Sequence, residues 1–350
     1  RNCDEAWEQV KETFSHPGRL FAKVLLIALL CGVVAGGSYL LKIRAPQLPN
    51  KGDAQKDPNQ TQVDEIDYGD GVRPKAGGER KSKDFYTVLV LGRDTGGGGN
   101  TDTMLLASYD VTNQKANVMS IPRDTMVNVP WDIKKINSVY NYYGAGEKGI
   151  KALYKEVSQL VGFEPDYQVI VEWDAVGAIV EAMGGVYYDV PRNMNYDDPY
   201  QDLHIHQTKG YRLLSGEDAM QVLRYRHDND RHYGYPDGDL GRIKTQQTLL
   251  KEMVKQLLQL KNVTKIGEFA RVVKNNVPSD LTFEEMLWFG SQAVMGGLKV
   301  DDVNFVTMPN TGKYIYSRSI GKPLSYVVPN AQELLDLVNN DLSPFVEKFT

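Results

Sequence analysis

The sequence predicts an α/β protein in which a mixed central sheet is flanked by helices and preceded by one transmembrane helix. Three observations support this prediction. An apolar segment occupies residues 20–42, short β-rich runs open the part that follows, and helical patterns then alternate with strands up to the C-terminus. We therefore expect four consecutive segments, which are a cytoplasmic stub at 1–19, the transmembrane helix at 20–42, an extracytoplasmic linker at 43–84 and one folded domain at 85–350.

The apolar segment has the length of a single membrane span. From residue 20 to 41 it contains one charge, Lys23, and about 20 apolar residues match the hydrocarbon core of a bilayer. A buried core helix and a cleaved signal peptide are the alternatives, and the lack of a small-residue cleavage site disfavours the second. Basic residues flank both ends, so the orientation rests on the short stub before the span. That arrangement predicts a single-pass type II protein of the cell membrane with its domain outside the cytoplasm.

The linker and the overall composition narrow the function classes. Residues 43–84 are rich in proline, glycine and charge, which is typical of a solvated tether, although its last residues can still pack on the domain as an irregular edge. The net charge of -5, with both signs mixed, disfavours a nucleic-acid partner. Both cysteines, Cys3 and Cys31, precede the domain, so the domain cannot depend on disulfides or thiolate metal sites.

The elements of the domain follow from local periodicity. Runs at 85–91, 103–109 and 116–121 predict a β-meander, and Ser215 with Asp218 predicts a capping box at the start of a short helix. Further strands are expected at 167–173, 186–190 and 303–308, and helices at 135–143, 149–161, 175–183, 240–260, 283–295 and 331–339. Four glycines at 96–99 follow a strand without a GK[ST] sequence or a helix, which argues against an ATP-type P-loop.

The first polar cluster lies where the first strand ends and the second begins. Arg93 and Asp94 close one strand, and Asp102 opens the next. Adjacent antiparallel strands bring these ends together, so both aspartates can approach one cation. Paired carboxylates suit Mg²⁺ or Mn²⁺. The alternative is a glycine-rich hairpin whose aspartates only cap turns.

The second cluster follows the third strand. Arg123 and Asp124 come directly after a proline, and Lys135 and Asn137 lie a dozen residues on. An arginine at a strand end can direct its planar guanidinium group at a phosphate or carboxylate. A plain surface ion pair between Arg123 and Asp124 is the alternative.

The third cluster contains two arginines separated by one residue. In an extended chain Arg224 and Arg226 project from the same side, and two adjacent guanidinium groups favour an anion between them. Arg242 and Gln246, four residues apart, share one face of the next helix, which Asp239 can cap. Solvated helix charges would explain any one of these arginines, but they explain the whole set poorly.

Histidines suggest a separate possibility. His204 and His206 can share one face of a strand, and His227 and His232 follow. Zinc is conceivable, but no HExxH motif, cysteine or ordered spacing accompanies them. Ordinary surface or loop histidines are therefore the favoured interpretation.

Several of these motifs occur together in an order that resembles the LytR-CpsA-Psr family, and the resemblance covers residue 85 to the C-terminus. The motifs are LGRD at 91–94, TDT at 101–103, SIPRDT at 120–125, KIN at 135–137, GGVYYDVP at 184–191, LHI at 203–205, LSGEDAMQVLRYRHD at 214–228 and DLGRIKTQQ at 239–247. The family fold is an α/β sandwich with an apolar tunnel for a prenyl chain, so the resemblance implies that fold here.

The resemblance also implies an activity. Members attach teichoic acids or capsular polysaccharide to peptidoglycan by phosphotransfer from an undecaprenyl-pyrophosphate-linked precursor, and release undecaprenyl phosphate. The implied protein is a Mg²⁺-dependent glycopolymer–peptidoglycan phosphotransferase of a Gram-positive cell wall. Phosphoryl transfer needs mainly positioning and charge neutralisation, which a metal and several arginines can supply.

The residue roles that the resemblance implies fall into three groups. Asp94 and Asp102 would hold the metal, and Asp102 or Asp124 would deprotonate the acceptor hydroxyl. Pyrophosphate oxygens would be bound by Arg123, Lys135, Arg224, Arg226, Arg242 and Gln246, with Arg93 as a further pyrophosphate-binding residue.

The sequence departs from the family pattern at one position. Asn100 stands where members often carry an arginine before the second acidic motif, so either Arg93 replaces that charge or the site uses one arginine fewer. Two other functions remain open, namely hydrolysis of a lipid pyrophosphate and a non-catalytic regulator that binds wall polymer.

Overall fold

The structure is a computed structural model of the 350-residue chain, and it describes residues 45–46, 48, 74–93, 101–200, 202–259 and 266–350. The chain divides into two compact units, Arg1–Pro46 and Gln47–Thr350, and the fold below is that of the second. The described residues include no helix long and apolar enough to cross a bilayer. The predicted span at 20–42 and most of the predicted linker lie outside the described residues.

A five-stranded mixed sheet forms the centre of the unit, in the order β4-β1-β2-β3-β9. Its middle is an antiparallel meander, and its two outer strands run parallel to their neighbours. The strands are β1 (Phe85–Arg93), β2 (Thr101–Asp110), β3 (Lys115–Ile121), β4 (Tyr167–Glu172) and β9 (Val303–Thr307), which follows a short 3-10 turn at Val300–Asp302. The predicted meander and the mixed sheet are therefore confirmed.

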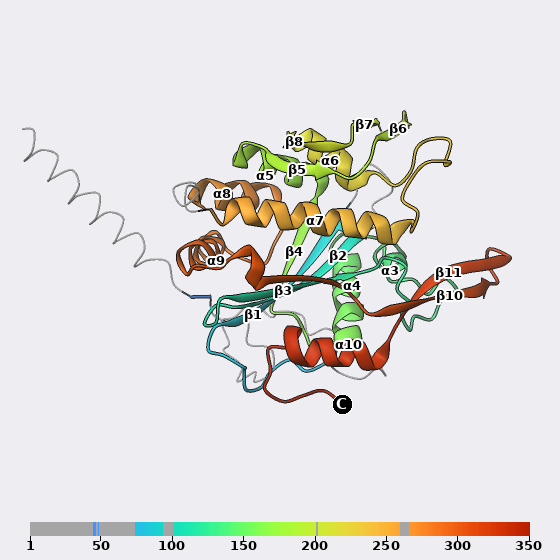
Figure 1. Cartoon of the computed structure of the whole chain (residues 1–350). Coiled ribbons are helices and arrows are strands. Elements are labelled where there is room, and N and C mark those ends of the chain that lie inside the picture. Colours follow the sequence, from blue (N-terminus) through green and yellow to red (C-terminus); the bar gives the residue numbers. More distant parts are fainter. Residues whose placement is uncertain (1–44, 47, 49–73, 94–100, 201, 260–265) are drawn as a thin grey trace, which may run out of the picture. The chain divides into compact units, whose positions relative to one another are not determined.

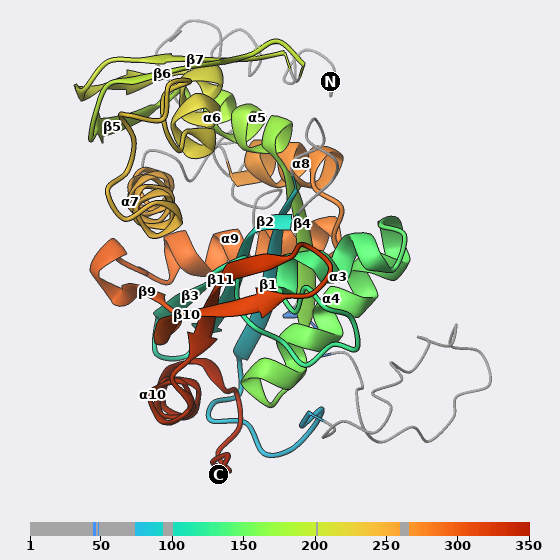
Figure 2. The ribbon, with the colours of Figure 1, turned by 90° about the vertical axis from the view of Figure 1, so that its right-hand side faces the viewer.

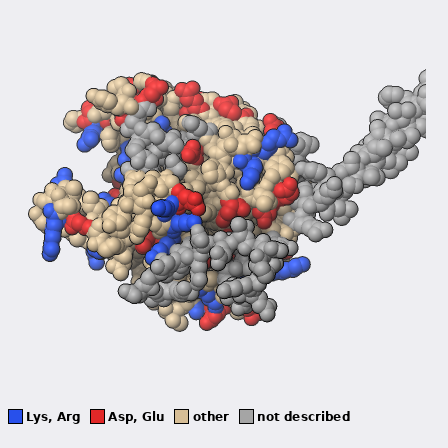
Figure 3. All heavy atoms as spheres, turned by 180° about the vertical axis from the view of Figure 1, so that it is seen from behind, with Lys and Arg blue, Asp and Glu red and all other residues tan. Residues whose placement is uncertain are grey.

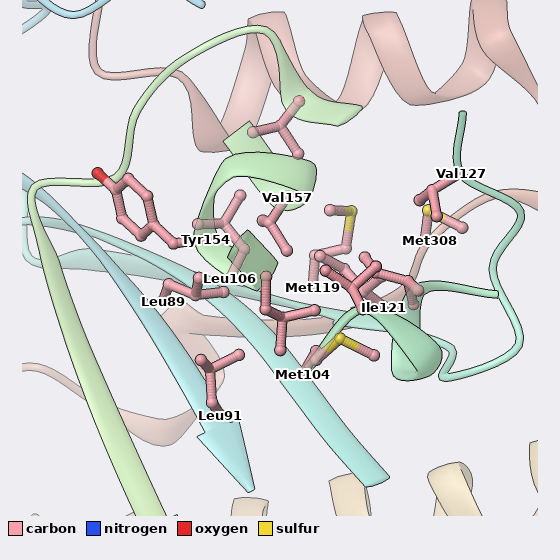
Figure 4. Packing of buried hydrophobic residues seen from close by; sticks show 14 of the residues in the cluster. Leu89, Leu91, Met104, Leu106, Met119, Ile121, Val127, Tyr154, Val157 and Met308 are labelled. Carbon is pink, nitrogen blue, oxygen red and sulfur yellow. The ribbon is translucent and has the colours of Figure 1, made fainter. Parts of the chain in front are cut away.

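One face of the sheet carries the larger core. Side chains at every second position point to this face because strand side chains alternate, and Leu89, Met104 and Leu106 are each at most 1% exposed. They pack against three helices, α3 (Ile136–Tyr142), α4 (Gly146–Val161) and α10 (Ala331–Leu337), the last of which continues into a π-helical turn at Val338–Leu342. Figure 4 shows Tyr154 and Val157 of α4 beside these strand residues.

Other helices cover the opposite face. Tyr86 projects there and contacts Trp288 and Phe289 of α9 (Phe283–Met295) edge to face, with ring centroids 5.6 and 5.0 Å apart. Gln247 of α7 (Asp239–Leu257) donates to Ser120 of β3 and to Val306 and Thr307 of β9. Figure 1 shows the sheet between α7, α8 (Ile266–Asn276) and α9 on one side and α4 and α10 on the other.

A second core lies beyond α7, as Figure 2 shows from the side. It is built from two small sheets and two helices, and α7 contributes Leu249 and Met253 to it. The elements are α5 (Trp173–Met183), β5 (Val186–Val190), β6 (Met194–Asp198), β7 (Leu203–Gln207), β8 (Gly210–Leu214) and α6 (Gly216–Arg224), in which β5 pairs with β8 and β6 with β7. The predicted capping box is confirmed, since the Ser215 and Asp218 side chains bond each other's backbone N–H groups.

The end of the predicted linker packs against the domain. Lys75 forms a bridge with Phe163, and Lys81 N–H donates to the Pro344 carbonyl. Arg80 makes a bidentate ion pair with the buried Asp166, at 3.0 and 2.5 Å, and Asp166 also accepts from the backbone N–H and the hydroxyl of Thr87. Residues 74–84 therefore form an edge of the folded domain, which the sequence had allowed as one possibility.

A long hairpin, β10 (Asn310–Ser317) with β11 (Lys322–Pro329), completes the fold. Asp132 holds it through hydrogen bonds from the hydroxyls of Ser317 and Ser319, and these bonds keep the pKa of the Asp132 carboxyl well below its ordinary value. On the face drawn in Figure 3, basic and acidic side chains of the described residues are interspersed, as the mixed composition predicts.

Candidate functional site

The ends of several strands that carry the predicted polar clusters lie together at one edge of the central sheet. In the β1 register Arg93 pairs with Thr101 of β2 and with Glu172 of β4, and in the β3 register Ser120 pairs with Thr307 of β9. The clusters at the end of β1, the start of β2 and the end of β3 therefore meet at this edge. Glu172, which the sequence analysis did not single out, lies there as well.

The first cluster is described only at its base. Asp94 and the side chains of Arg93 and Asp102 lie outside the part of the chain that the structure describes. Arg93 pairs with Thr101 across the two strands, and Asp94 and Asp102 are the next residues in the sequence after this pair. Their oxygen donors suit a hard divalent cation such as Mg²⁺. The Thr103 hydroxyl, next to Asp102, donates to Gln246 Oε1 at 3.4 Å and so connects this cluster to α7.

The second cluster is a tight turn fixed by α3 and β11. The Asn137 N–H donates to the Arg123 carbonyl at 3.1 Å, and the Val327 N–H donates to the Asp124 carbonyl at 3.0 Å. Asp124 forms an ion pair with Lys135 at 3.1 Å, and both side chains are at most 24% exposed. This long-range pair brings the PRDT and KIN segments together and gives Asp124 a partner other than its neighbour Arg123.

In the third cluster Arg224 and Arg226 flank a fully buried tyrosine. Arg224 ends α6, and the backbone at Tyr225 is extended, with φ -62° and ψ 139°. Tyr225 is 0% exposed and packs in the second core, whereas both arginines are partly exposed. The alternation is what an extended chain requires when the middle residue points inward. The buried Tyr225 side chain thus anchors the backbone between Arg224 and Arg226.

The loop after Arg226 is tied down by Asp228. Its carboxylate accepts from the Tyr225 hydroxyl at 2.7 Å and from the Asn195 N–H of β6 at 3.0 Å, while the Tyr235 N–H donates to the Arg226 carbonyl. Burial, followed by the bond to Asp228, raises the pKa of Tyr225 above its ordinary value. The tyrosine therefore remains a neutral donor wherever the protein is folded near neutral pH.

We expect Asp228→Ala to lower the free energy of unfolding by about 1–3 kcal/mol, because the buried Tyr225 hydroxyl loses its acceptor. Chemical denaturation followed by circular dichroism measures the change. Asp230→Ala is the matched control, since this residue lies on the same loop with an exposed side chain that bonds only within the loop tip. Equal stability of the two variants would contradict the role given to Asp228.

The long helix α7 contributes the remaining predicted residues. It begins at Asp239, and Gly238 rather than Asp239 is its N-cap residue, with φ +57°, so the predicted cap is wrong by one residue. A glycine takes this left-handed conformation without the steric cost that a Cβ adds. Arg242, in the first turn, is only 3% exposed, which is unusual for arginine and is not what a solvated helix charge would show.

Two adjacent glutamines of α7 connect the layers. Gln246 Nε2 donates to the Leu223 carbonyl of α6, next to Arg224, at 3.1 Å, and Gln246 Oε1 accepts from Thr103. Gln247 bonds Ser120, Val306 and Thr307 at the ends of β3 and β9. The sequence predicts no role for Gln247, although its place in the DLGRIKTQQ motif marks it as a candidate.

The four histidines do not come together. His227 bonds the Asp228 carbonyl in the loop, and His232 is 88% exposed at its tip. His204 and His206 lie on β7, where Asp197 of β6 joins them. Within the described residues this is the one group of three or more such side chains that could hold a metal ion, and it lies apart from the sheet edge, on the β6–β7 hairpin.

Comparison with known proteins identifies the chain. The model of the LytR_cpsA_psr family matches residues 47–340. The chain belongs to the LytR-CpsA-Psr family. Its membership confirms the resemblance carried by the motifs, and the match begins within the segment predicted as a linker, in keeping with the packing of residues 74–84 on the domain.

Relatives and solved structures agree with this membership. The chain is 28% identical over 246 residues to "Regulatory protein MsrR" of Staphylococcus aureus, covering 68% of each chain. It is 27% identical over 212 residues, 59% of this chain and 64% of the relative, to "Polyisoprenyl-teichoic acid--peptidoglycan teichoic acid transferase TagU" of Enterococcus faecalis. The crystal structure of B. subtilis TagV superposes with a TM-score of 0.59 at 23% identity, covering 73% of this chain and 95% of TagV, which shows the shared fold.

Proposed function

We propose that this protein transfers a glycopolymer from an undecaprenyl-pyrophosphate carrier to peptidoglycan. The observation that carries the proposal is the position of Gln246, whose amide bonds both the α6 residue before Arg224 and the β2 residue after Asp102. Gln246 thereby connects segments that are predicted to bind anions and metal at one edge of the sheet. The chain also belongs to a family in which a relative from E. faecalis is a teichoic acid transferase. A teichoic acid or capsular polysaccharide is the proposed polymer class.

The arginines would bind the pyrophosphate. Arg224 and Arg226 lie on either side of buried Tyr225, which anchors the backbone between them, and Arg242 is buried in the first turn of α7. Guanidinium groups match phosphate oxygens in bidentate geometry. Arg123 and Lys135 would supply positive charge from the side of the PRDT turn, where Asp124 orients Lys135. Fixed cations of this kind stabilise charge that develops during phosphoryl transfer.

In the reaction, a sugar hydroxyl of peptidoglycan would form a bond to the phosphorus nearer the polymer. The bond from that phosphorus to the bridging oxygen breaks, and the oxygen leaves with undecaprenyl phosphate. The proton of the hydroxyl passes to a site carboxylate, Asp102 or Asp124. Mg²⁺ or Mn²⁺ bound by Asp94 and Asp102 would neutralise pyrophosphate charge.

The carrier lipid bears on the location of the protein. Because a polyprenyl chain resides in a bilayer, a transferase that uses it works at a membrane surface. The predicted span at 20–42, with the domain in a type II orientation outside the cytoplasm, would keep the site there.

Asn100 stands where family members often carry an arginine. We propose that Arg93 supplies the missing positive charge, since Arg93 pairs with Thr101, the residue after Asn100, across the strand ends.

The test is a product analysis with a teichoic acid-type lipid-linked precursor and peptidoglycan. We expect a covalent polymer–glycan product by mass spectrometry, with loss of product on adding EDTA and recovery with excess Mg²⁺. Free phosphorylated polymer as the sole product would support the hydrolase alternative instead. Binding of precursor without any turnover would support a non-catalytic regulator.

A further inference from the structure

A cluster of metal-ligand side chains on the β6–β7 hairpin lies outside the site described above. In this antiparallel pair Asp197 is opposite His204, and Asn195 is opposite His206. Cross-strand partners share a face, and residues two apart on a strand do so as well, so all four side chains lie on one face. Met194 and Ile205, on the other face, are buried in the second core. The register therefore gathers the polar set on the outer surface.

The distances within this set are those of a compact site. Asp197 Oδ1 lies 2.6 Å from His204 Nδ1 and 3.1 Å from His206 Nε2, and one ligand atom from each residue lies within 4.8 Å of the others. Two donors on one tetrahedral Zn²⁺, at about 2.0–2.1 Å from the metal, are about 3.3 Å apart. The Asp197–His204 pair must therefore open by about 0.7 Å to hold the ion. Both side chains are about half exposed, at 45% and 56%, and have room to do so.

The second nitrogen of each imidazole faces an acceptor outside the cluster. His206 Nδ1 lies 2.8 Å from Asn195 Oδ1, and His204 Nε2 lies 3.6 Å from Asp202 Oδ1. A proton on these outer nitrogens leaves the inner nitrogens as lone pairs directed at the Asp197 carboxylate. In that tautomer the inner nitrogens can bind a cation together with the Asp197 carboxylate. Metal-ligating histidines characteristically donate their other N–H to a carboxylate or carbonyl oxygen in this way.

We propose that Asp197, His204 and His206 form a binding site for a transition-metal ion of the Zn²⁺ class, with a coordination position open to water. Two imidazoles and one carboxylate favour Zn²⁺ over the oxygen-seeking Mg²⁺ and Ca²⁺. This site is distinct from the proposed Mg²⁺ site at the sheet edge. The sequence favoured ordinary surface histidines because the third ligand, Asp197, is defined only by the hairpin register.

The metal would brace a segment that is already connected to the arginine loop. The Asp197 N–H donates to Asn229 Oδ1 at 2.8 Å, and Asn229 Nδ2 donates back to the Asp197 carbonyl at 2.7 Å. The His206 N–H donates to Gln221 of α6 at 3.0 Å. The ligand-bearing strands are thus bonded to the loop after Arg226 and to α6, which ends at Arg224. This bracing role does not depend on the proposed transferase activity.

Zinc titration of the full chain tests this proposal, with ZnCl₂ in competition with a chromophoric chelator. We expect the unaltered protein to bind one more equivalent of Zn²⁺ than the His204→Ala or the His206→Ala variant. Because the measured quantity is a difference between variants, a second zinc site elsewhere does not obscure the result. His232→Ala is the matched control, because this exposed histidine lies 3.7 Å from Asp230 outside the cluster, and it should bind like the unaltered protein. Asn195→Ala, which removes only the outer acceptor, should weaken binding about 10-fold.

A proton competes with the metal ion for the histidine nitrogens of this cluster. The hydrogen bond that His204 donates to Asp197 raises the pKa of His204 above its ordinary value, so an imidazolium–carboxylate cluster without metal is the alternative state. Equal zinc stoichiometry in the unaltered protein and in a double His204→Ala, His206→Ala variant would overturn the proposal in favour of that state. Thermal unfolding without zinc checks that each variant is folded.

Discussion

Arg224→Ala and Arg226→Ala are each expected to lower the rate of polymer transfer by about two to three orders of magnitude, the usual loss when one fixed donor to a developing oxyanion is removed. The reason is geometric. Tyr225 is fully buried between them and its backbone is extended, which fixes the two arginines at separate points of the chain. The rate is measured as polymer–glycan product formed per enzyme at saturating precursor.

Arginine-to-lysine substitution at the same positions separates charge from geometry. Lysine keeps the positive charge but lacks the planar fork, so Arg224→Lys and Arg226→Lys should recover only part of the lost rate. The control is Arg231→Ala, an exposed arginine at the tip of the same loop, which should leave the rate unchanged. If the alanine variants fold and retain more than half of the rate, the two arginines do not bind the reacting group.

Loss of the Asp166 carboxylate is expected to have the largest effect on stability. Asp166→Ala leaves Arg80 without its bidentate partner in a site where the arginine side chain is 16% exposed, and it removes the acceptor of both Thr87 donors. Breaking a buried ion pair from one side costs about 3–5 kcal/mol, and the partial exposure of Arg80 puts the expected loss near 3 kcal/mol. Urea denaturation measures it.

Two further variants sharpen that experiment. Asp166→Asn keeps the shape and an oxygen acceptor, so it should cost clearly less than alanine. Glu347→Ala removes the partner of Lys75 in a pair whose glutamate is 78% exposed, and no measurable change is expected there. If Asp166→Ala is as stable as Glu347→Ala, residues 74–84 are not fastened to the domain by this pair.

The part of the fold that sequence alone predicts is the part with local periodicity. The meander consists of short runs of β-favouring, mostly apolar residues separated by turn residues, and α7 and α9 repeat apolar residues at helical spacing, so their existence follows from neighbours along the chain. The hairpins β6–β7 and β10–β11 were not predicted. The first strand of each hairpin, MNYDD of β6 and NTGKYIYS of β10, is mostly polar and buries a single residue, so it carries no alternation that distinguishes a strand from a loop.

The candidate site also has a part that the sequence predicts and a part that it does not. That polar clusters follow strand ends is visible in the sequence, because a strand's end is defined by the chain itself. The pairing of Asp124 with Lys135, the burial of Arg242 and the approach of Asp197 to two histidines each depend on contacts between distant segments. Only the folded register supplies these contacts, and the sequence offers an ion pair between Arg123 and Asp124 only as an alternative.

The two glutamines of α7 fix the rotation of this helix about its own axis. Gln246 is bonded to α6 and β2, while Gln247 is bonded to β3 and β9. Each residue of an α-helix turns by about 100°, so one residue inserted between Arg242 and Gln246 would rotate Arg242 by about 100° relative to both amides. The spacing of four residues between Arg242 and Gln246 therefore sets the direction in which this arginine leaves the helix.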